Sequence, residues 1–343
     1  MSASPLFSVV IPVFNKGPYV SRAIHSVLAQ TQCDFELLAV CEPSSDHSTR
    51  EVERFTDPRL RVFHRSAPGP GGYAARNLGI ENARAPWIAF LDADDLWLPD
   101  HLRRLTALIH AFPSQKILSS GWLLQSKTSL PDRYSQLHHD EPSHVIDLKD
   151  YLRSEARSAR PIWTGVACIQ RELLLAAGLF PAGKLARSGD LDTWFRCIFD
   201  AGSMAWSAHI GAIYDFDTIH QVTRRDGVDL RQHQISIGDA LSRTQNVDIR
   251  RLLHERENNL VINAWVSNLY VSGAPCFAIV RQLNWRHPLA HQLKCLAYGA
   301  ASLLPKPIAR FVHQSLARAR LHTICSWEAS HALCNFIRQR VSR

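Results

Sequence analysis

Residues 87–95 read Trp-Ile-Ala-Phe-Leu-Asp-Ala-Asp-Asp, a short apolar run that leads directly into three carboxylates. Such a run predicts a strand buried on both faces, as in a parallel sheet. Ligands of these sheets bind just beyond the carboxyl ends of the strands, so we expect Asp92, Asp94 and Asp95 on a turn beside a ligand crevice. Carboxylates at positions i and i+2 can hold a divalent cation, and Mg²⁺ commonly takes one or two carboxylates plus substrate phosphates. The simpler alternative is a helix N-cap before residues 96–99.

The composition is typical of a globular protein. The chain has 343 residues, of which 46% are hydrophobic and 20% charged. A chain of this length typically forms about two domains. The formal net charge of +8 suits an anionic partner such as a nucleotide, a nucleic acid or a membrane surface.

The cysteines and the N-terminus indicate a reducing compartment. None of the eight cysteines forms a C-x-x-C pair, and Cys168, Cys197, Cys276 and Cys295 lie in apolar runs. We therefore expect buried reduced thiols, and neither a zinc ribbon nor a disulfide framework. Residues 1–5 lack the pattern of a signal peptide, and no run of 18 apolar residues predicts a transmembrane helix. We expect a cytoplasmic protein.

Strands and helices alternate along the first third of the chain. Strands are expected at 6–12, 35–40, 60–63 and 87–91, with helices between them. This alternation predicts βαβ units and a mainly parallel sheet. Further on, we expect a polar loop at 126–143 and strands at 163–169, 203–207 and 210–216. A helix at 193–201 should be capped by Asp192. From 229 onward the pattern is helical.

The loop from Gly69 to Ala74 supports a different function. It matches G-x-G-x-x-A, follows a strand and opens a helix, and Asp92 lies about twenty residues further on. This is a dinucleotide fingerprint, and it leaves a nucleotide-dependent oxidoreductase as an alternative. Against it, the fingerprint normally occupies the first βα turn, and it gives no role to Asp94 and Asp95.

Four segments together resemble the family 2 glycosyltransferases, which have the GT-A fold. They are Val-Ile-Pro-Val-Phe-Asn at 10–15, Gly-Gly-Tyr-Ala-Ala-Arg-Asn at 71–77, the DxD at 92–94 and Ser-Gly-Asp-Leu-Asp-Thr-Trp-Phe-Arg at 188–196. The resemblance covers residues 7 to about 225. It implies a GT-A catalytic domain at 5–225, with a nucleotide-sugar-binding half at 5–112 and an acceptor-binding half at 113–225. The remainder, 226–343, is then a basic helical region.

The resemblance also implies roles for individual residues. Asp190 falls on the family's catalytic base, and Asp94 and His220 are expected at a Mg²⁺ or Mn²⁺ ion held on the diphosphate of the donor. The expected donor-binding residues are Pro12, Phe14, Asn15, Glu42, Ser44, Asp46, Arg76, Asn77 and Asp92. Inverting glycosyl transfer needs these two elements, because a carboxylate must accept the acceptor's proton and a cation must neutralise the leaving diphosphate.

The chain departs from the family pattern at two positions. A UDP-sugar is favoured as the donor. Because Cys41 and Glu42 stand where paired aspartates are usual, however, the identity of the nucleotide stays open. Gly189 replaces the glutamate before the base. The QxxRW motif of processive relatives is absent, which favours transfer of a single residue. Trp163 and Trp194 are expected in the core rather than against a sugar.

The sequence therefore predicts an inverting glycosyltransferase that acts on a sugar or a lipid-linked sugar, in the synthesis of a cell-surface polysaccharide or glycolipid. A basic protein that binds a membrane or a nucleic acid is a third alternative, and no nucleic acid is expected as a partner of the transferase. Near the end of the chain, Ile308, Phe311, Val312 and Leu316 fall on one helical face beside basic residues. This pattern predicts either a helix lying in an anionic membrane interface, on the inner face of the cell membrane, or ordinary packing on the catalytic domain.

Overall fold

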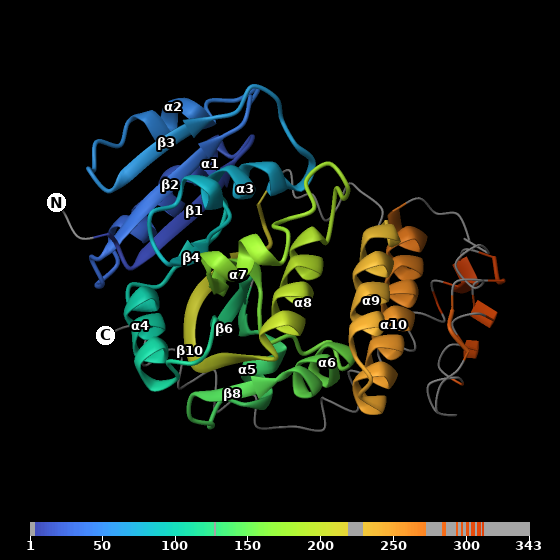
Figure 1. The fold of residues 1–343 in the computed structure, drawn as a ribbon. Helices are drawn as coiled ribbons and strands as arrows, with labels where there is room; N and C mark the ends of the chain where they lie inside the picture. Colours follow the sequence, from blue (N-terminus) through green and yellow to red (C-terminus); the bar gives the residue numbers. More distant parts are fainter. Residues whose placement is uncertain are drawn as a thin grey trace. The chain divides into compact units, whose positions relative to one another are not determined.

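A computed structural model describes residues 4–126, 128–218 and 229–271, together with short pieces between residues 283 and 311 (Figure 1). Contacts divide the chain into two compact units, Met1–Leu260 and Val261–Arg343. The first unit contains the whole described sheet. It extends past residue 225, so helix α9 (Arg231–Arg243) and the first part of α10 (Val247–Val271) belong to the same unit as the sheet.

Four parallel strands form the N-terminal part of this sheet. They are β1 (Phe7–Val13), β2 (Phe35–Cys41), β3 (Leu60–His64) and β4 (Trp87–Phe90). The order is β3-β2-β1-β4, with Phe7 of β1 opposite both Phe35 and Trp87. β1 and β4 are therefore neighbours, and both end at the same edge, where residues 14–16 follow β1 and residues 91–95 follow β4.

The sheet continues as β4-β9-β6-β10-β5, which makes it mixed. The added strands are β5 (Leu96–Trp97), β6 (Ile117–Gln125), β9 (Cys168–Gln170) and β10 (Ser203–Asp215), with β7 (Ser129–Pro131) and β8 (His144–Asp147) off this path. β9 is antiparallel to both β4 and β6, whereas β10 is parallel to β6. The expected mainly parallel, mixed α/β fold is confirmed.

Helices cover both faces of the sheet (Figure 1). They are α1 (Gly17–Leu28), α2 (Ser48–Glu53), α3 (Tyr73–Asn82), α4 (His101–Ala111), α5 (Arg133–Leu137), α6 (Leu148–Ala156), α7 (Arg171–Ala176) and α8 (Gly189–Ala201). Two 3₁₀ turns, Pro70–Gly72 and Thr164–Val166, precede α3 and β9.

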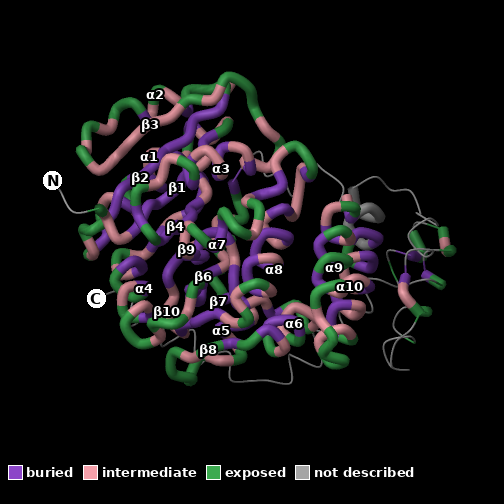
Figure 2. Tube along the Cα trace, in the orientation of Figure 1, coloured by how far each residue is buried: buried purple, intermediate pink, exposed green. Residues whose placement is uncertain are grey.

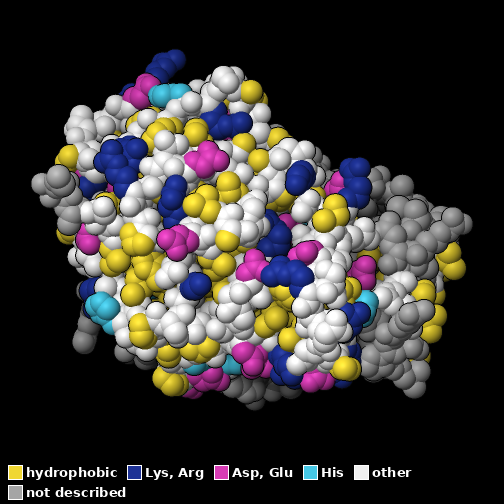
Figure 3. All heavy atoms as spheres, viewed as in Figure 1, with side chains coloured by type: hydrophobic (Ala, Val, Ile, Leu, Met, Phe, Trp, Pro, Cys, Tyr) yellow, Lys and Arg dark blue, Asp and Glu magenta, His cyan; other side chains and the backbone are white. Residues whose placement is uncertain are grey.

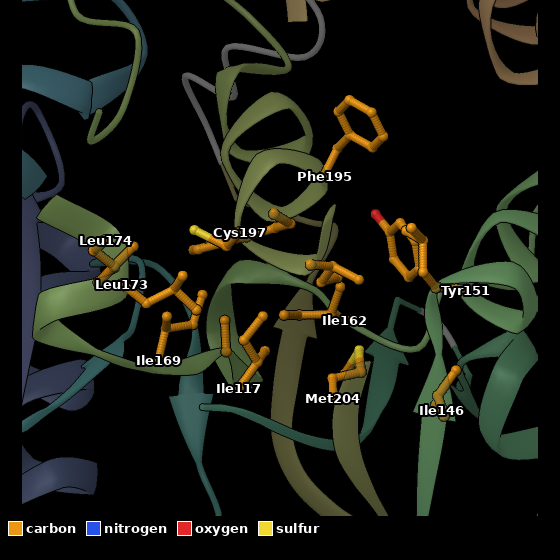
Figure 4. Close-up of a cluster of buried hydrophobic side chains, with 14 of the residues drawn as sticks. Ile117, Ile146, Tyr151, Ile162, Ile169, Leu173, Leu174, Phe195, Cys197 and Met204 are labelled. Carbon is orange, nitrogen blue, oxygen red and sulfur yellow. The ribbon is translucent and has the colours of Figure 1, made fainter. Parts of the chain in front are cut away.

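Alternation along β1 divides its side chains between two cores. Val9 and Ile11 pack in a cluster with α1 and α4, while Val10 belongs to the cluster beneath α8. The second cluster includes Ile117, Ile169 and Phe195 (Figure 4). The buried strands thus lie between two layers of helices, as the burial colours show (Figure 2). Burial on both faces is why the strands read as continuous apolar runs.

Several expected elements differ from the structure. The stretch at 126–143 contains β7 and α5, because Asp132 accepts hydrogen bonds from the N–H groups of Tyr134 and Ser135 and so caps a helix. The two strands expected at 203–216 are one strand, β10, whose two register shifts absorb residues 208–209 and residue 211. The strand expected at 163–169 is instead the Thr164–Val166 turn followed by β9.

None of the helices in the described residues is long and apolar enough to cross a membrane. The expected membrane-interface segment lies mostly outside the described residues, including Val312 and Leu316. Ile308 and Phe311 are described, and both are exposed. On the face of the first unit shown in Figure 3, basic side chains are interspersed with acidic and apolar ones. The membrane interface therefore stays a prediction.

His101, the first residue of α4, gives the fold a pH dependence. The side chain is fully buried against Trp97, and Gly211 leaves room for the ring, since an added Cβ would lie 2.1 Å from His101 Nδ1. Burial, and then the charge of His209, lower the pKa of His101 to about 3. An unfolded histidine has a pKa near 6.5, so the unfolded state binds a proton first as the pH falls. The stability from neutral His101 is present above pH ~6.5 and is lost on acidification.

We expect the free energy of unfolding to fall by up to about 1.4 kcal/mol per pH unit between about pH 6 and pH 4 through this one group. His101→Gln removes the titration and should flatten this part of the profile in urea denaturation. His110→Gln, at an exposed position on the same helix, is the control and should keep the wild-type slope. Equal slopes for both variants would contradict the assignment.

Candidate active site

A cavity of about 380 Å³ opens where β1 and β4 end. It is lined by Pro12, Phe14, Asn15, Lys16, Glu42, Gly69, Pro70, Gly71, Gly72, Tyr73, Arg76, Asp92, Ala93, Asp94, Trp163, Thr164, Arg187, Ser188, Asp190 and Tyr214. Eight of the residues expected from the sequence therefore lie around one space: Pro12, Phe14, Asn15, Glu42, Arg76, Asp92, Asp94 and Asp190. They come from segments that are up to about 180 positions apart, and the strand order brings them together.

The glycine loop forms one wall of the cavity. Gly71 and Gly72 have φ angles of 71° and 66°, in the left-handed region that side chains disfavour. An added Cβ at Gly71 would lie 2.4 Å from the Tyr73 ring and 2.8 Å from the Ala186 carbonyl oxygen. The loop is held from below by Glu42, which accepts a hydrogen bond from Gly69 N at 3.1 Å and pairs with Arg65. These contacts fix the backbone beside the space that a donor would occupy.

Arg76 fixes the first carboxylate of the DxD motif. Its buried guanidinium donates to Asp92 Oδ1 and, at 2.8 Å, to the Gly71 carbonyl oxygen. Burial lowers the pKa of Arg76, but the charges of Asp92 and Tyr73 outweigh it and raise the pKa overall. Arg76 is therefore a permanent cation that joins the glycine loop to the end of β4.

Asp94 carries a second cation contact. Lys16 Nζ lies 2.5 Å from Asp94 Oδ2, and Thr218 Oγ1 donates to the same oxygen at 2.9 Å. These bonds engage Oδ1 of Asp92 and Oδ2 of Asp94, which leaves the other oxygen of each carboxylate for a metal ion. Within the described residues no three His, Cys, Asp or Glu side chains form a cation site by themselves. The pair suits Mg²⁺ or Mn²⁺ that also takes substrate phosphates. His220 lies outside the described residues.

Asp95 has a structural position behind the motif. It is fully buried and accepts a hydrogen bond from Asp215 N at 3.1 Å, which ties the turn to the end of β10. Burial, and then the charges of Asp94 and Asp92, raise the pKa of Asp95 well above its ordinary value. Asp95 does not line the cavity, so only Asp92 and Asp94 of the three carboxylates do.

Asp190 faces the cavity from the first turn of α8. The helix begins at Gly189, four residues earlier than expected, because Ser188 takes a left-handed φ of 64° and turns the chain. Thr164 Oγ1 donates to Asp190 Oδ2 at 3.3 Å. Asp192 is not the N-cap. It is buried in the same first turn of α8 and accepts hydrogen bonds from Arg196 at 2.9 Å and Ser236 at 2.6 Å.

Gly189 replaces a glutamate of the family pattern for a steric reason. Its N–H donates to the Tyr73 hydroxyl at 2.8 Å, and an added Cβ would lie 2.7 Å from Tyr73 Cζ and 2.8 Å from Pro181 Cγ. The phenol of Tyr73 thus fills the place of the missing side chain. It also joins the donor wall to the helix that carries Asp190.

Three expected donor-binding residues do not line the cavity. Ser44 Oγ accepts a hydrogen bond from Asn15 N at 3.1 Å, and Asp46 accepts one from Gly17 N at 2.9 Å. Asn77 bonds the backbone of Phe180 through both atoms of its amide, at 3.0 and 2.9 Å. These residues position the loops around the cavity. Direct donor contacts for them stay predictions.

Sequence reasoning missed several lining residues, among them Lys16, Tyr73, Thr164, Arg187 and Tyr214. Lys16 and Tyr73 lie inside or beside the recognised motifs, so they could have been found from the sequence. Thr164 and Tyr214 carry no local signal, because only the packing of segments far apart in the sequence brings them to the same cavity as Asp190.

Glu42 allows a test of nucleotide recognition. If its carboxylate reads the base as expected, Glu42→Gln should weaken UDP binding by roughly 1–3 kcal/mol, as for a lost hydrogen bond to a charged group. Inorganic pyrophosphate, which has no base, should bind the variant and the wild type equally in calorimetric titrations. An equal loss for both ligands would mean that Glu42 acts only by holding the glycine loop.

The family model described as "Glycosyl transferase family 2" matches residues 8–139. These residues belong to glycosyl transferase family 2. The matched region contains the glycine loop, Arg76, Asp92 and Asp94, so the expected family is confirmed there. The oxidoreductase alternative is not supported for this domain. The glycine loop and α3 connect β3 to β4, and in the sheet these two strands are separated by β2 and β1. The dinucleotide fingerprint instead belongs to a compact βαβ unit.

Curated relatives resemble part of the transferase domain. An uncharacterized glycosyltransferase of Rickettsia felis (strain ATCC VR-1525 / URRWXCal2) is 45% identical over 100 residues, 28% of this chain and 16% of the relative. The succinoglycan biosynthesis protein ExoO of Rhizobium meliloti (strain 1021) is 41% identical over 102 residues, 29% of each chain. A UDP-Glc:alpha-D-GlcNAc-diphosphoundecaprenol beta-1,3-glucosyltransferase of Escherichia coli is 38% identical over 98 residues, 28% of this chain and 38% of the relative. The matches thus span between about a sixth and two fifths of these relatives.

Solved structures share the fold over most of the chain. S. aureus TarS 1-349 in complex with UDP-GlcNAc has a TM-score of 0.63 at 16% identity, covering 91% of this chain and 92% of that chain. The mannosyltransferase PcManGT from Pyrobaculum calidifontis, in complex with GDP-Man and Mn2+, has a TM-score of 0.55 at 18% identity, covering 95% of this chain and 88% of that chain. The described residues of the first unit thus have a GT-A type fold.

Proposed function

We propose that this protein transfers a sugar from a nucleoside diphosphate sugar to a hydroxyl group of an acceptor, with inversion at the anomeric carbon. One observation carries the proposal. A single cavity brings the glycine loop, the Asp92–Asp94 carboxylates and Asp190 together, although they come from three separate parts of the chain. Family membership of residues 8–139 supports donor binding on the first of these walls.

The residues divide the chemistry between them. The glycine loop and Arg76 bind the donor's diphosphate side, and Asp92 and Asp94 would hold a divalent metal. When bound, that metal neutralises charge on the departing diphosphate. Asp190 accepts the proton of the acceptor hydroxyl as its oxygen attacks the anomeric carbon. The new glycosidic C–O bond forms while the bond to the diphosphate breaks, and the diphosphate leaves with the electron pair.

Thr164 positions the base in this scheme. Its hydroxyl donates to Asp190 Oδ2, which leaves Oδ1 to face the acceptor. The carboxylate is therefore oriented before the acceptor arrives.

The relatives support finer proposals. A UDP-sugar donor is favoured, since TarS was solved with UDP-GlcNAc and the Escherichia coli relative is named for UDP-Glc, whereas PcManGT was solved with GDP-Man. The bound Mn2+ of PcManGT supports a divalent ion at Asp92 and Asp94. The diphosphoundecaprenol in the name of the Escherichia coli relative supports a lipid-linked acceptor and work at the inner membrane surface. Such an acceptor also fits a role in polysaccharide synthesis.

A donor panel tests the proposed function. The full chain is incubated with UDP-, GDP- and TDP-sugars, with Mn²⁺ or with excess EDTA, and the released nucleoside diphosphate is measured. We expect one donor to be hydrolysed slowly without acceptor, and only with the metal. Titration with NADH should show no binding. Release from no donor, or binding of NADH in preference to UDP, would overturn the proposal.

A further inference from the structure

Aromatic side chains line the cavity on the side of Asp190. Trp163 and Tyr214 both line it and are only partly buried, whereas Trp194, expected in the core with Trp163, is fully buried. The Trp163 ring lies 5.7 Å from Trp122 and 5.1 Å from Tyr214, between centroids. Its inner part packs on the core and its outer part forms the cavity wall. The core position expected for Trp163 is therefore only half correct.

The chain fixes the orientation of this indole. An added Cβ at Gly165 would lie 2.2 Å from Trp163 Cζ3 and 2.3 Å from Cη2, so the ring rests against backbone that only glycine leaves bare. On the other side, Trp97 Nε1 donates to the Gly165 carbonyl oxygen at 2.6 Å. The Thr164–Val166 turn is thus clamped between two tryptophans.

The strand order places this wall opposite the donor wall. β4 lies between β1 and β9, so the carboxylates after β4 separate the loop after β1 from the turn that leads into β9. The glycine loop and Glu42 belong to the first side, and Trp163 and Thr164 to the second. Thr164, the residue after Trp163, is the one that donates to Asp190. A sugar ring stacked on Trp163 would therefore lie near Asp190, and the Asp92 and Asp94 carboxylates would separate it from the nucleotide.

We infer that Trp163 is the platform for a pyranose ring of the acceptor, a role that rests on the proposed function. One face of a pyranose presents C–H bonds, which pack against the negative face of an aromatic ring, while the hydroxyls project from its edge. A ring stacked on Trp163 directs an edge hydroxyl to Asp190. Tyr214 adds a second aromatic contact. The acceptor is accordingly a saccharide held by its own ring, and a lipid carrier is not needed for this contact.

Saturation-transfer NMR on the full chain with UDP and Mn²⁺ tests the platform, with methyl β-D-glucopyranoside, methyl β-D-galactopyranoside and methyl β-D-N-acetylglucosaminide as probes. We expect saturation of the C–H protons on one face of at least one glycoside. Trp163→Ala should reduce this signal at least about tenfold, and Trp163→Phe should restore part of it. Gly165→Ala should also reduce it, because the added methyl group displaces the indole without removing it.

Controls separate the failure of this inference from that of the proposed function. Calorimetric binding of UDP should be the same in all three variants as in the wild type, because the glycine loop and Glu42 lie on the other side of the carboxylates, and thermal melting should show that the variants fold. Should the wild type release no nucleoside diphosphate from any donor, the proposed function itself fails. The platform alone fails if donor hydrolysis persists while no glycoside is saturated, or while Trp163→Ala and the wild type give equal signals.

Discussion

Asp190→Asn is expected to lower the turnover number by about 10²–10⁴ while leaving the affinity for the donor unchanged, the usual effect of losing a positioned base. The amide keeps the shape of the carboxylate and can still accept the hydrogen bond of Thr164. It cannot take the proton of the acceptor hydroxyl. Donor affinity should persist because the glycine loop and Arg76 lie on the opposite wall. Turnover is measured as nucleoside diphosphate released in the presence of acceptor, and affinity by titration with UDP.

The same helix offers a matched control for this variant. Asp200 is exposed near the end of α8 and pairs with Arg243 at 2.6 Å, away from the cavity. Asp200→Asn therefore makes the same chemical change at no cost to the active site, and its turnover should equal that of the wild type. If donor affinity falls as far as turnover in Asp190→Asn, Asp190 binds the donor or supports the fold, and the base lies elsewhere.

Asp94→Asn is expected to abolish the part of UDP binding that depends on Mn²⁺. The change removes one of two carboxylates that face the cavity, and the metal affinity should fall by at least about 10–100-fold, the loss seen even for groups that only support metal ligands. The fold should survive, because an amide oxygen can still accept the hydrogen bond of Thr218. Calorimetric titration with UDP, with Mn²⁺ or with excess EDTA, measures the metal-dependent increment.

The control for Asp94 is Asp100, whose carboxylate pairs with Arg103 at the surface just before α4. Asp100→Asn should retain the full increment. Full transfer activity of Asp94→Asn in excess EDTA would show that the metal role is wrong. In that case the Lys16 ammonium, 2.5 Å from Asp94 in the structure, becomes the cation beside the donor's diphosphate.

The sequence predicts the strands of residues 5–112 and the turns that follow them well, for a physical reason. Buried parallel strands such as residues 87–90 are continuous apolar runs, and the residues that follow them face the ligand, so pattern and position coincide. Residues 113–225 are different. Their turns depend on single residues such as Ser188. Its left-handed backbone turns the chain, so that α8 begins at Gly189 rather than at the expected residue 193. The aromatic wall depends on pairing between β6 and β10, which no local pattern encodes.

Single residues also explain the departures from the family pattern. In the sequence, Gly189 stands where the family pattern has a glutamate. In the structure, the Tyr73 ring fills the space of that side chain, and the Tyr73 hydroxyl accepts a hydrogen bond from the Gly189 N–H. Asn77 is expected to contact the donor because it lies within a motif, but in the structure both its amide nitrogen and its amide oxygen bond the Phe180 backbone. Motif matching finds the segments that surround a site. It does not tell which side chains in those segments face inward.

The position of β9 makes the two halves inseparable as modules. This strand, Cys168–Gln170, comes after the family match has ended at residue 139, yet it lies in the middle of the sheet between β4 and β6. A shortened chain that stops at residue 139 lacks β9, so the facing edges of β4 and β6 have no strand between them. Such a chain also lacks Asp190. Donor specificity therefore cannot be exchanged between such enzymes by grafting the matched segment alone. A working chimera has to carry the central strand and the helix behind it from the same parent.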